Sequence, residues 1–272
     1  MTMEWREQEG VRWLEADLGG ARAAFGTRLG GVSEPPFDSL NLGVVTDDEP
    51  ANVRENRLRL ATALGHDPGR ITFARQVHGA ELLTHRGPPS CAFWSPEDPN
   101  SQVKAGPPEA DGHVISEAGL AALVFTADCL PVAVSGPGGV AMLHCGWRGL
   151  AAGIVASGAA AVEATDAAIG PGIGPCCYEV GPEVLDAFRH LGESAAPPAD
   201  GPISCSRINL SAHRRLDLVE MARRLLAAAG VRRVQSADLC TRCHPELFFS
   251  HRRDEGRTGR QGNLAWIEPV EA

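Results

Sequence analysis

Three residues of this chain have side chains that could do chemistry together: His78 in Arg-Gln-Val-His-Gly, Cys129 in Thr-Ala-Asp-Cys-Leu-Pro and His144 in His-Cys-Gly-Trp-Arg-Gly. Each lies at the end of a short apolar run of the kind that forms a strand. Two imidazoles and a thiolate can bind zinc and leave a fourth position open for water. The same residue types could instead form a cysteine nucleophile and its base. The sequence therefore offers a choice between a metal centre and a nucleophilic cysteine.

Sequence spacing supports only part of this group. Cys129 and His144 are separated by a strand, a Gly-Pro-Gly-Gly turn and a second strand, and such a hairpin brings its two ends together. His78 has to reach the same place from an earlier strand, which spacing does not show. On spacing alone, the simpler interpretation is that the histidines are structural and that Cys129 is a core thiol.

A second group of cysteines, Cys240-Thr-Arg-Cys243-His244, has the spacing of a c-type haem attachment site. Covalent haem attachment needs export, and the N-terminus lacks the basic and then apolar order of a signal peptide. A structural zinc ion would need a second ligand pair, but Cys176 and Cys177 are adjacent rather than spaced. We therefore predict that these four cysteines are ordinary loop thiols, dispensable for catalysis.

Composition excludes several classes of protein. The chain has 272 residues, 43% hydrophobic and 22% charged, which is typical of a globular protein. Its net charge of -9 does not favour binding to DNA or RNA, whose phosphates are also negative. No apolar run approaches the roughly 18 residues of a membrane span. We predict a cytoplasmic protein with no nucleic-acid or membrane partner, whose eight cysteines are thiols or ligands rather than disulfides.

Periodicity and turn residues indicate mixed secondary structure. A helix is predicted from Pro50 to Leu64, closed by Gly65. From Gly112 onward, short apolar segments alternate with turns, and an Ala-rich helix follows. The chain shows no internal repeat and no break in composition, so we predict one α+β domain over residues 1–272. The other predicted strands are 71–77, 112–116, 120–126, 131–135, 140–144, 167–173, 231–236 and 263–267, the other helices are 150–163, 182–191 and 210–229, and residues 86–110 and 192–206 are predicted loops.

Many separate motifs, in order from Thr27 to Trp266, resemble those of the laccase-domain, or YfiH-like, family. This resemblance implies an α+β fold with mixed β-sheets in α, β, β and α layers. It also implies zinc ligands at His78, Cys129 and His144. The motifs are Gln76-Val-His78-Gly, Ala110-Asp111-Gly112, Thr126-Ala-Asp128-Cys129-Leu-Pro131, His144-Cys-Gly-Trp147-Arg148-Gly149, Ile173-Gly174-Pro175, Tyr178-Glu-Val-Gly-Pro182, Phe248-Phe-Ser-His-Arg252-Arg253 and Thr258-Gly259-Arg260.

The family resemblance implies an enzyme that acts on purine nucleosides. The implied activities are phosphorolysis of adenosine, inosine, guanosine and methylthioadenosine, together with deamination of adenosine. A zinc ion with an open position lowers the pKa of bound water to about 7, which suits deamination. A deaminase also needs an acid, and Asp128 and Asp111 are the candidates beside Cys129 itself. Asp128 could equally be a turn carboxylate that orients a ligand imidazole.

Phosphorolysis needs a group that holds phosphate. Arginine suits this task because its planar guanidinium bonds phosphate bidentately. The candidates are Arg28 in a glycine-rich loop, Arg148 close to His144, and Arg252 in Ser-His-Arg-Arg. Each could instead be solvated or paired with an aspartate. Asn41 could bond a ribose hydroxyl or hold a turn. The predicted partners are thus a nucleoside and phosphate, and the sequence does not indicate an oligomeric state.

Other functions stay open. The family has also been described as copper oxidases, but none of the nine histidines forms the His-x-His pair typical of a three-copper cluster. Copper competes well with zinc for such sites, so a copper-dependent phenol oxidase is one alternative. Another is a cysteine hydrolase or amidase acting on a cell-wall precursor, with Cys129 activated by His144. A non-enzymatic purine-binding module is the third.

Overall fold

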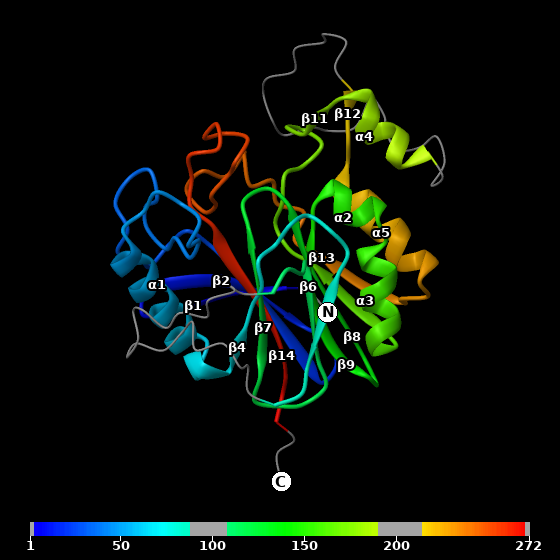
Figure 1. The fold of residues 1–272 in the computed structure, drawn as a ribbon, viewed down its shortest axis with the longest axis horizontal. Helices are drawn as coiled ribbons and strands as arrows, with labels where there is room; N and C mark the ends of the chain where they lie inside the picture. Colours follow the sequence, from blue (N-terminus) through cyan, green and yellow to red (C-terminus); the bar gives the residue numbers. More distant parts are fainter. Residues whose placement is uncertain (1–2, 88–107, 190–213, 270–272) are drawn as a thin grey trace.

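The computed structural model describes residues 3–87, 108–189 and 214–269. In this part of the chain, two mixed six-stranded sheets lie face to face, and helices cover their outer faces (Figure 1). This is the α+β arrangement of α, β, β and α layers implied by the family resemblance. No helix among the described residues is long and apolar enough to cross a membrane.

The first sheet has the strand order β1-β2-β3-β14-β7-β4 and is antiparallel except for the β4–β7 pair. Its three N-terminal strands were not among the predicted elements. One of them, β3, consists largely of Ala and Gly, which have weak strand propensity, so only pairing with its neighbours identifies it. The strands are β1 (Glu4–Gln8), β2 (Val11–Asp17), β3 (Ala21–Gly26), β4 (Ile71–Thr72), β7 (Ala121–Thr126) and β14 (Gln261–Ile267).

The second sheet has the order β13-β10-β8-β9-β6-β5, with parallel pairs at its two edges. Its central hairpin, β8 and β9, turns at Gly136 and Gly139 as the Gly-Pro-Gly-Gly sequence predicts. The strands are β5 (Leu82–His85), β6 (Gly112–Ile115), β8 (Leu130–Gly136), β9 (Gly139–Cys145), β10 (Asp166–Ile169) and β13 (Arg233–Ser236). A separate short ribbon pairs β11 (Glu179–Val180) with β12 (Arg214–Arg215).

Three clusters of buried side chains hold the layers together. One lies between the two sheets and includes Phe25 and Met142. Another packs the first sheet against α1 (Pro50–Ala63), and the third packs the second sheet against α3 and α5. The helices are α1, α2 (Trp147–Ala151), α3 (Ile154–Val162), α4 (Pro182–Ala187) and α5 (Leu218–Ala228), and Pro68–Arg70 forms a 3-10 turn.

Five of the predicted elements have wrong boundaries, among them the strand predicted over 167–173, which ends at Ile169, and the helix predicted over 182–191, which ends at Ala187. The helix predicted over 150–163 is two helices, α2 and α3, because Gly153 takes a positive φ of 91° between them. The helix predicted from residue 210 begins only at Leu218, where the Asp217 side chain accepts a hydrogen bond from the Glu220 amide and caps it. The strand predicted over 71–77 ends at Thr72. Residues 88–107 and 190–213, which contain most of both predicted loops, lie outside the described residues.

Candidate metal and substrate site

The hairpin of β8 and β9 brings Cys129 and His144 to one end of the second sheet. Pro131 pairs with His144 and Leu130 pairs with Cys145, so Cys129 lies directly beside the end of β9. The expectation that this hairpin unites the two residues is confirmed.

Two sets of hydrogen bonds hold His78 at the same end of the sheet. One joins Gln76 to β7, and the other joins residues 77–79 to Asp111. The amide side chain of Gln76 donates to the Phe125 carbonyl (2.8 Å) and accepts from the Phe125 N–H (2.7 Å) on β7. The backbone N–H groups of Val77, His78 and Gly79 all donate to the carboxylate of Asp111, at 3.1, 2.9 and 2.7 Å. These bonds support the left-handed backbone of His78, whose φ is 62°.

The three side chains form a group that could hold a metal ion. One ligand atom from each of His78, Cys129 and His144 lies within 4.8 Å of the others. The two imidazole rings lie edge to face, with centroids 4.9 Å apart. Gly146 leaves the space for this group, since a Cβ there would come within 3.1 Å of both the Cys129 Sγ and the His78 ring. His144 is buried whereas His78 is exposed, so one side of the group faces solvent.

The carboxylate of Asp111 holds two members of this group in place, His144 through its side chain and His78 through its backbone. It is fully buried, and His144 Nδ1–H donates to its Oδ1 at 2.7 Å. Burial alone would raise the pKa of Asp111, but hydrogen bonds from His144 and from the amides of Gly79 and Val77 outweigh it and lower that pKa. The carboxylate therefore stays ionised and orients His144 so that Nε2 is the nitrogen free for a ligand bond.

Replacing Asp111 by Asn should weaken metal binding by about 10- to 100-fold, the usual cost of losing an outer partner of a ligand histidine. The new NH2 group would face N–H donors that the carboxylate now accepts. Competition with a chromogenic chelator measures the affinity. Asp166→Asn is the matched control, because the buried Asp166 carboxylate pairs with Arg233 near the opposite end of the second sheet. Equal affinities for the two variants would remove Asp111 from this role.

Cys129 and His144 also perturb each other's pKa. Burial would raise the pKa of Cys129, but His144 and then His78 outweigh it and lower that pKa to about 6. Burial would lower the pKa of His144, yet the Cys129 sulfur and the Asp111 carboxylate raise it to about 9. At neutral pH the sulfur is thus a thiolate, the form that both metal binding and nucleophilic attack require.

Asp128 adjoins Cys129 but points its carboxylate elsewhere. Its oxygens accept hydrogen bonds from the Thr241 hydroxyl (2.6 Å) and the Arg252 amide (2.7 Å), and its carbonyl accepts from the Ile173 amide (2.8 Å). Like His78, it has a positive φ, 97°. These contacts indicate a residue that holds two neighbouring loops against the site, which is a turn role without a bond to a ligand imidazole.

Arg148, four residues after His144, and Arg252 both act electrostatically on Tyr178. Burial and then the Cys129 sulfur raise the pKa of Tyr178 to about 12, and the charges of Arg252 and Arg148 oppose this rise. Arg252 stacks on the Tyr178 ring at 5.3 Å and donates to the Glu179 carbonyl. Arg148 stacks on Trp147 at 4.5 Å, and none of the ion pairs found within residues 3–87, 108–189 and 214–269 includes it. Its exposed guanidinium has donors available for an anion.

Arg28 and Asn41 have internal partners. Arg28 pairs with the Asp38 carboxylate at 2.9 Å and stacks on Phe249 at 4.7 Å. Asn41 is fully buried and uses both amide hydrogens and both oxygen lone pairs, toward Thr46, Asp48 and the amides of Gly43 and Arg260. These contacts favour the Asp-paired alternative for Arg28 and the turn-holding alternative for Asn41.

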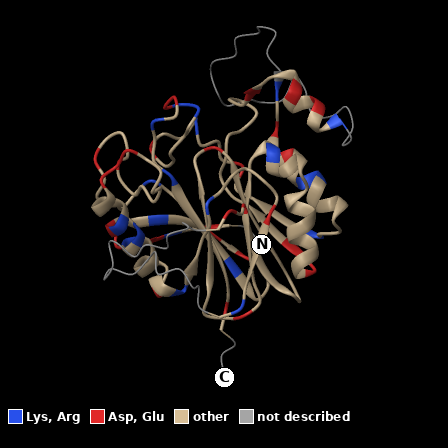
Figure 2. Cartoon of the chain, in the orientation of Figure 1, with Lys and Arg blue, Asp and Glu red and all other residues tan. Residues whose placement is uncertain are grey.

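Arg260 is a basic residue that the sequence analysis did not select. It follows several arginines in the loop between β13 and β14, where Figure 2 shows basic residues close together. Burial lowers the pKa of Arg260, and the charges of Cys129 and Asp128 oppose that shift. Its own hydrogen bonds run to the carbonyls of Thr258 and Gly259. Its place in the recognised Thr-Gly-Arg motif was the available signal.

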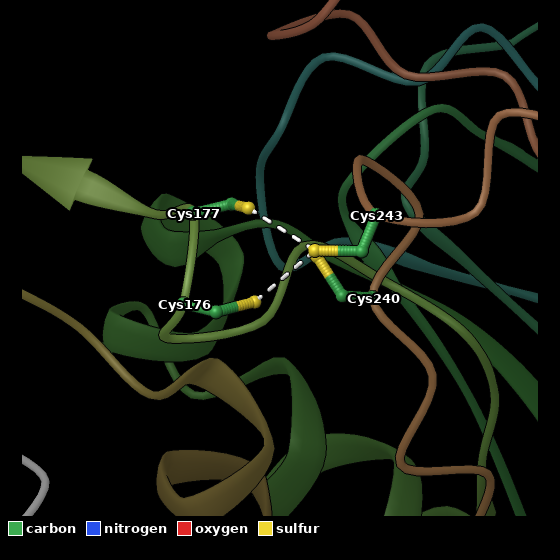
Figure 3. A group of neighbouring side chains, drawn as sticks. All are labelled: Cys176, Cys177, Cys240 and Cys243. Atoms are coloured by element: carbon green, nitrogen blue, oxygen red, sulfur yellow. Dashed lines mark hydrogen bonds between the residues drawn. The ribbon is translucent and has the colours of Figure 1, made fainter. Parts of the chain in front are cut away.

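Four further cysteines among the described residues form a second group. Cys176, Cys177, Cys240 and Cys243 point toward one another from two loops (Figure 3), and their sulfur atoms all lie within 4.8 Å. The prediction that Cys240 and Cys243 lack a second ligand pair is therefore wrong. Adjacent residues in a turn can direct both side chains to one side, which spacing rules for separated pairs do not anticipate.

Residues 22–268 match the profile of the family described as "Multi-copper polyphenol oxidoreductase laccase". The chain belongs to this family. Two of its relatives are "Purine nucleoside phosphorylase YfiH" of Escherichia coli, 38% identical over 91% of this chain and 94% of that protein, and "Purine nucleoside phosphorylase YlmD" of Geobacillus stearothermophilus, 35% identical over 96% of each.

Solved structures of the laccase-domain family share the fold. YlmD from Geobacillus stearothermophilus superposes with a TM-score of 0.78 at 34% identity, covering 97% of this chain and 98% of that one. A Bacillus licheniformis hypothetical protein YfiH gives a TM-score of 0.80 at 31% identity, over 97% and 99% of the two chains. The arrangement of two sheets and outer helices is thus that of the YfiH structures.

Proposed function

We propose that this chain is a zinc-dependent purine nucleoside phosphorylase that also deaminates adenosine. The observation that carries the proposal is the meeting of His78, Cys129 and His144, supported by Asp111, with Arg148 and Arg252 close by. The names of the relatives supply the substrate class. The compartment proposed is the cytoplasm, where both nucleosides and phosphate are available.

The donor set fits zinc. Two imidazole nitrogens and one thiolate within 4.8 Å make up the three-protein-ligand set of catalytic zinc sites. The bond from His144 Nδ1–H to Asp111 is the usual support of a ligand histidine. When bound, zinc acts as a Lewis acid and lowers the pKa of a bound water. Copper accepts the same ligands, so metal identity is part of the test.

Phosphorolysis makes a bond between a phosphate oxygen and C1′ of the sugar, breaks the bond between C1′ and the purine nitrogen, and releases the base with a proton. The chain's own contribution is to hold the phosphate close to C1′. Arg148 is the best-placed residue, because it is exposed next to the site and its guanidinium fork is not in an ion pair with the described residues. Arg252 is a second anion contact, steadied by Tyr178.

The two acidic candidates act by positioning. All the hydrogen bonds of Asp111 and Asp128 described above are accepted from donors, which suits ionised carboxylates rather than proton donors. We propose that Asp111 orients His144 and that Asp128 keeps the loops around Cys129 in place. Tyr178, whose pKa is about 12, keeps its proton at neutral pH and is available as a hydrogen-bond donor.

The test is chromatography of inosine and adenosine incubated with purified protein, with and without phosphate. Inosine should yield hypoxanthine and ribose 1-phosphate only when phosphate is present. Adenosine should yield inosine in either buffer. Free ribose formed at the same rate without phosphate would identify a nucleoside hydrolase and refute the proposal. No turnover across a nucleoside panel would favour a purine-binding module.

A cysteine hydrolase is the second candidate, and one observation favours it: the thiolate of Cys129 beside a protonated His144 resembles a nucleophile–base pair. A sulfur bound to zinc is a poor nucleophile, so the two functions are exclusive. Amidase activity that survives removal of all metal and is abolished by Cys129→Ser would establish the hydrolase. For a phenol oxidase, turnover should rise with copper loading, with oxygen consumed.

A further inference from the structure

The second cysteine group arises from the topology of the second sheet. Strands β10 and β13 are parallel neighbours, so the loops that follow them begin at the same end of the sheet. Gly172 and Cys240 form a parallel bridge between these loops, with hydrogen bonds from the Gly172 amide to the Leu239 carbonyl and from the Thr241 amide to the Gly172 carbonyl. Each loop then makes a tight turn that carries two cysteines.

We propose that Cys176, Cys177, Cys240 and Cys243 bind one zinc ion as a closed, structural site with four sulfur ligands. A tetrahedron with Zn–S bonds of about 2.3 Å has its sulfur atoms about 3.8 Å apart. The Cys243 sulfur lies 3.5 Å from that of Cys176 and 3.4 Å from that of Cys177, and all four sulfurs lie within 4.8 Å of one another. The distances between the sulfurs would therefore change only slightly on forming a zinc tetrahedron.

Two N–H donors face the sulfurs of this group. The Gly174 amide donates to the Cys240 Sγ at 3.3 Å, and Arg242 donates to Cys177. Such N–H bonds to sulfur disperse the negative charge that four thiolates place around a divalent ion. Gly174 also lies close to the group, because a Cβ there would come within 3.4 Å of the Cys176 sulfur. A soft sulfur set selects zinc over magnesium or calcium.

The sulfurs are not joined as disulfides. A disulfide has an S–S distance of about 2.0 Å, and none of the described cysteines forms one. Binding of zinc would release the thiol protons to solvent and requires no oxidant. All four ligand positions come from the protein, so this ion would have no open position for a substrate, unlike the ion at His78, Cys129 and His144.

This zinc site would stabilise the loop that reaches the first site. Thr241 lies between two of the proposed ligands, and its hydroxyl donates to Asp128 Oδ1 at 2.6 Å. Its carbonyl accepts from the Arg253 guanidinium at 3.1 Å. From the other loop, the Ile173 amide donates to the Asp128 carbonyl. The four-sulfur site therefore ties together the two segments that hold Asp128, the residue next to Cys129.

Metal content in two reciprocal variants tests the proposal. Protein purified under reducing conditions with zinc supplied should hold one ion at each group. Cys129→Ala should lose the ion of the first group only, and the double variant Cys240→Ser/Cys243→Ser should lose the ion of the four-sulfur group only. Each variant is the control for the other, so failure of this proposal is distinguishable from failure of the proposed function, on which it does not depend.

X-ray absorption at the zinc edge of the Cys129→Ala protein gives a second measurement, which does not require the double variant to fold. The expected result is four sulfur neighbours at about 2.3 Å. Chelation of that ion should lower the melting temperature of Cys129→Ala. Absence of zinc from Cys129→Ala, a first shell containing nitrogen or oxygen, or a Cys176–Cys243 or Cys177–Cys243 disulfide in the purified protein would overturn the four-sulfur site.

Discussion

Replacing Cys129 by Ala should remove the metal of the first site and lower phosphorolysis of inosine and deamination of adenosine together, each by at least about 100-fold. The expected size follows from the several kcal/mol that a metal ion contributes to transition-state stabilisation, with about 1.4 kcal/mol for each factor of ten in rate. The side chain is the proposed sulfur ligand beside two imidazoles, and its loss leaves two of the three proposed protein ligands. Elemental analysis and initial rates measure the two effects.

The result also separates zinc catalysis from a cysteine nucleophile. If zinc is the catalyst, stripping the metal from unaltered protein should abolish activity, and added zinc should restore it. The Cys129→Ala protein is the control, because added zinc should restore no activity where the sulfur is missing. Full activity in metal-free Cys129→Ala protein would falsify the zinc mechanism.

Replacing Arg148 by Ala should lower phosphorolysis by about 10- to 100-fold, the value of a charge-assisted hydrogen bond of roughly 1.5–3 kcal/mol. Deamination of adenosine should fall only a few-fold, because water rather than an anion is its second substrate. Arg148→Lys should have an intermediate effect, since Lys keeps the charge but loses the planar fork. The concentration of phosphate needed for half-maximal rate should rise in both variants. Kinetics with varied phosphate test each point.

The comparison of the two reactions controls for damage to the fold, because a distorted site would lower both alike. Arg59→Ala is a matched control for loss of one arginine. Arg59 is exposed on α1, outside the other sheet, and pairs with Glu55 in the same helix. Equal losses in phosphorolysis and deamination would assign Arg148 a structural role and leave Arg252 as the better phosphate ligand.

The amino-acid sequence by itself determined the local parts of this protein. Pro50 and Gly65 mark the limits of α1, and the turn from Gly136 to Gly139 sets the hairpin that joins Cys129 to His144. These predictions succeed because helix ends and tight turns depend on neighbouring residues only. The ordered motifs likewise identify the family without knowledge of the fold.

The tertiary structure decided which distant segments meet. Asp111 binds three successive amides at residues 77–79 and also His144, and no local pattern connects those positions. The four sulfurs meet because β10 and β13, more than 60 residues apart, are parallel neighbours. Such pairing depends on how sheets and helices bury their apolar faces together, which is a property of the whole chain. The turn sequence therefore predicted the meeting of two of the three residues of the first site, whereas only the packing of the sheets revealed the supporting role of Asp111 and the second site.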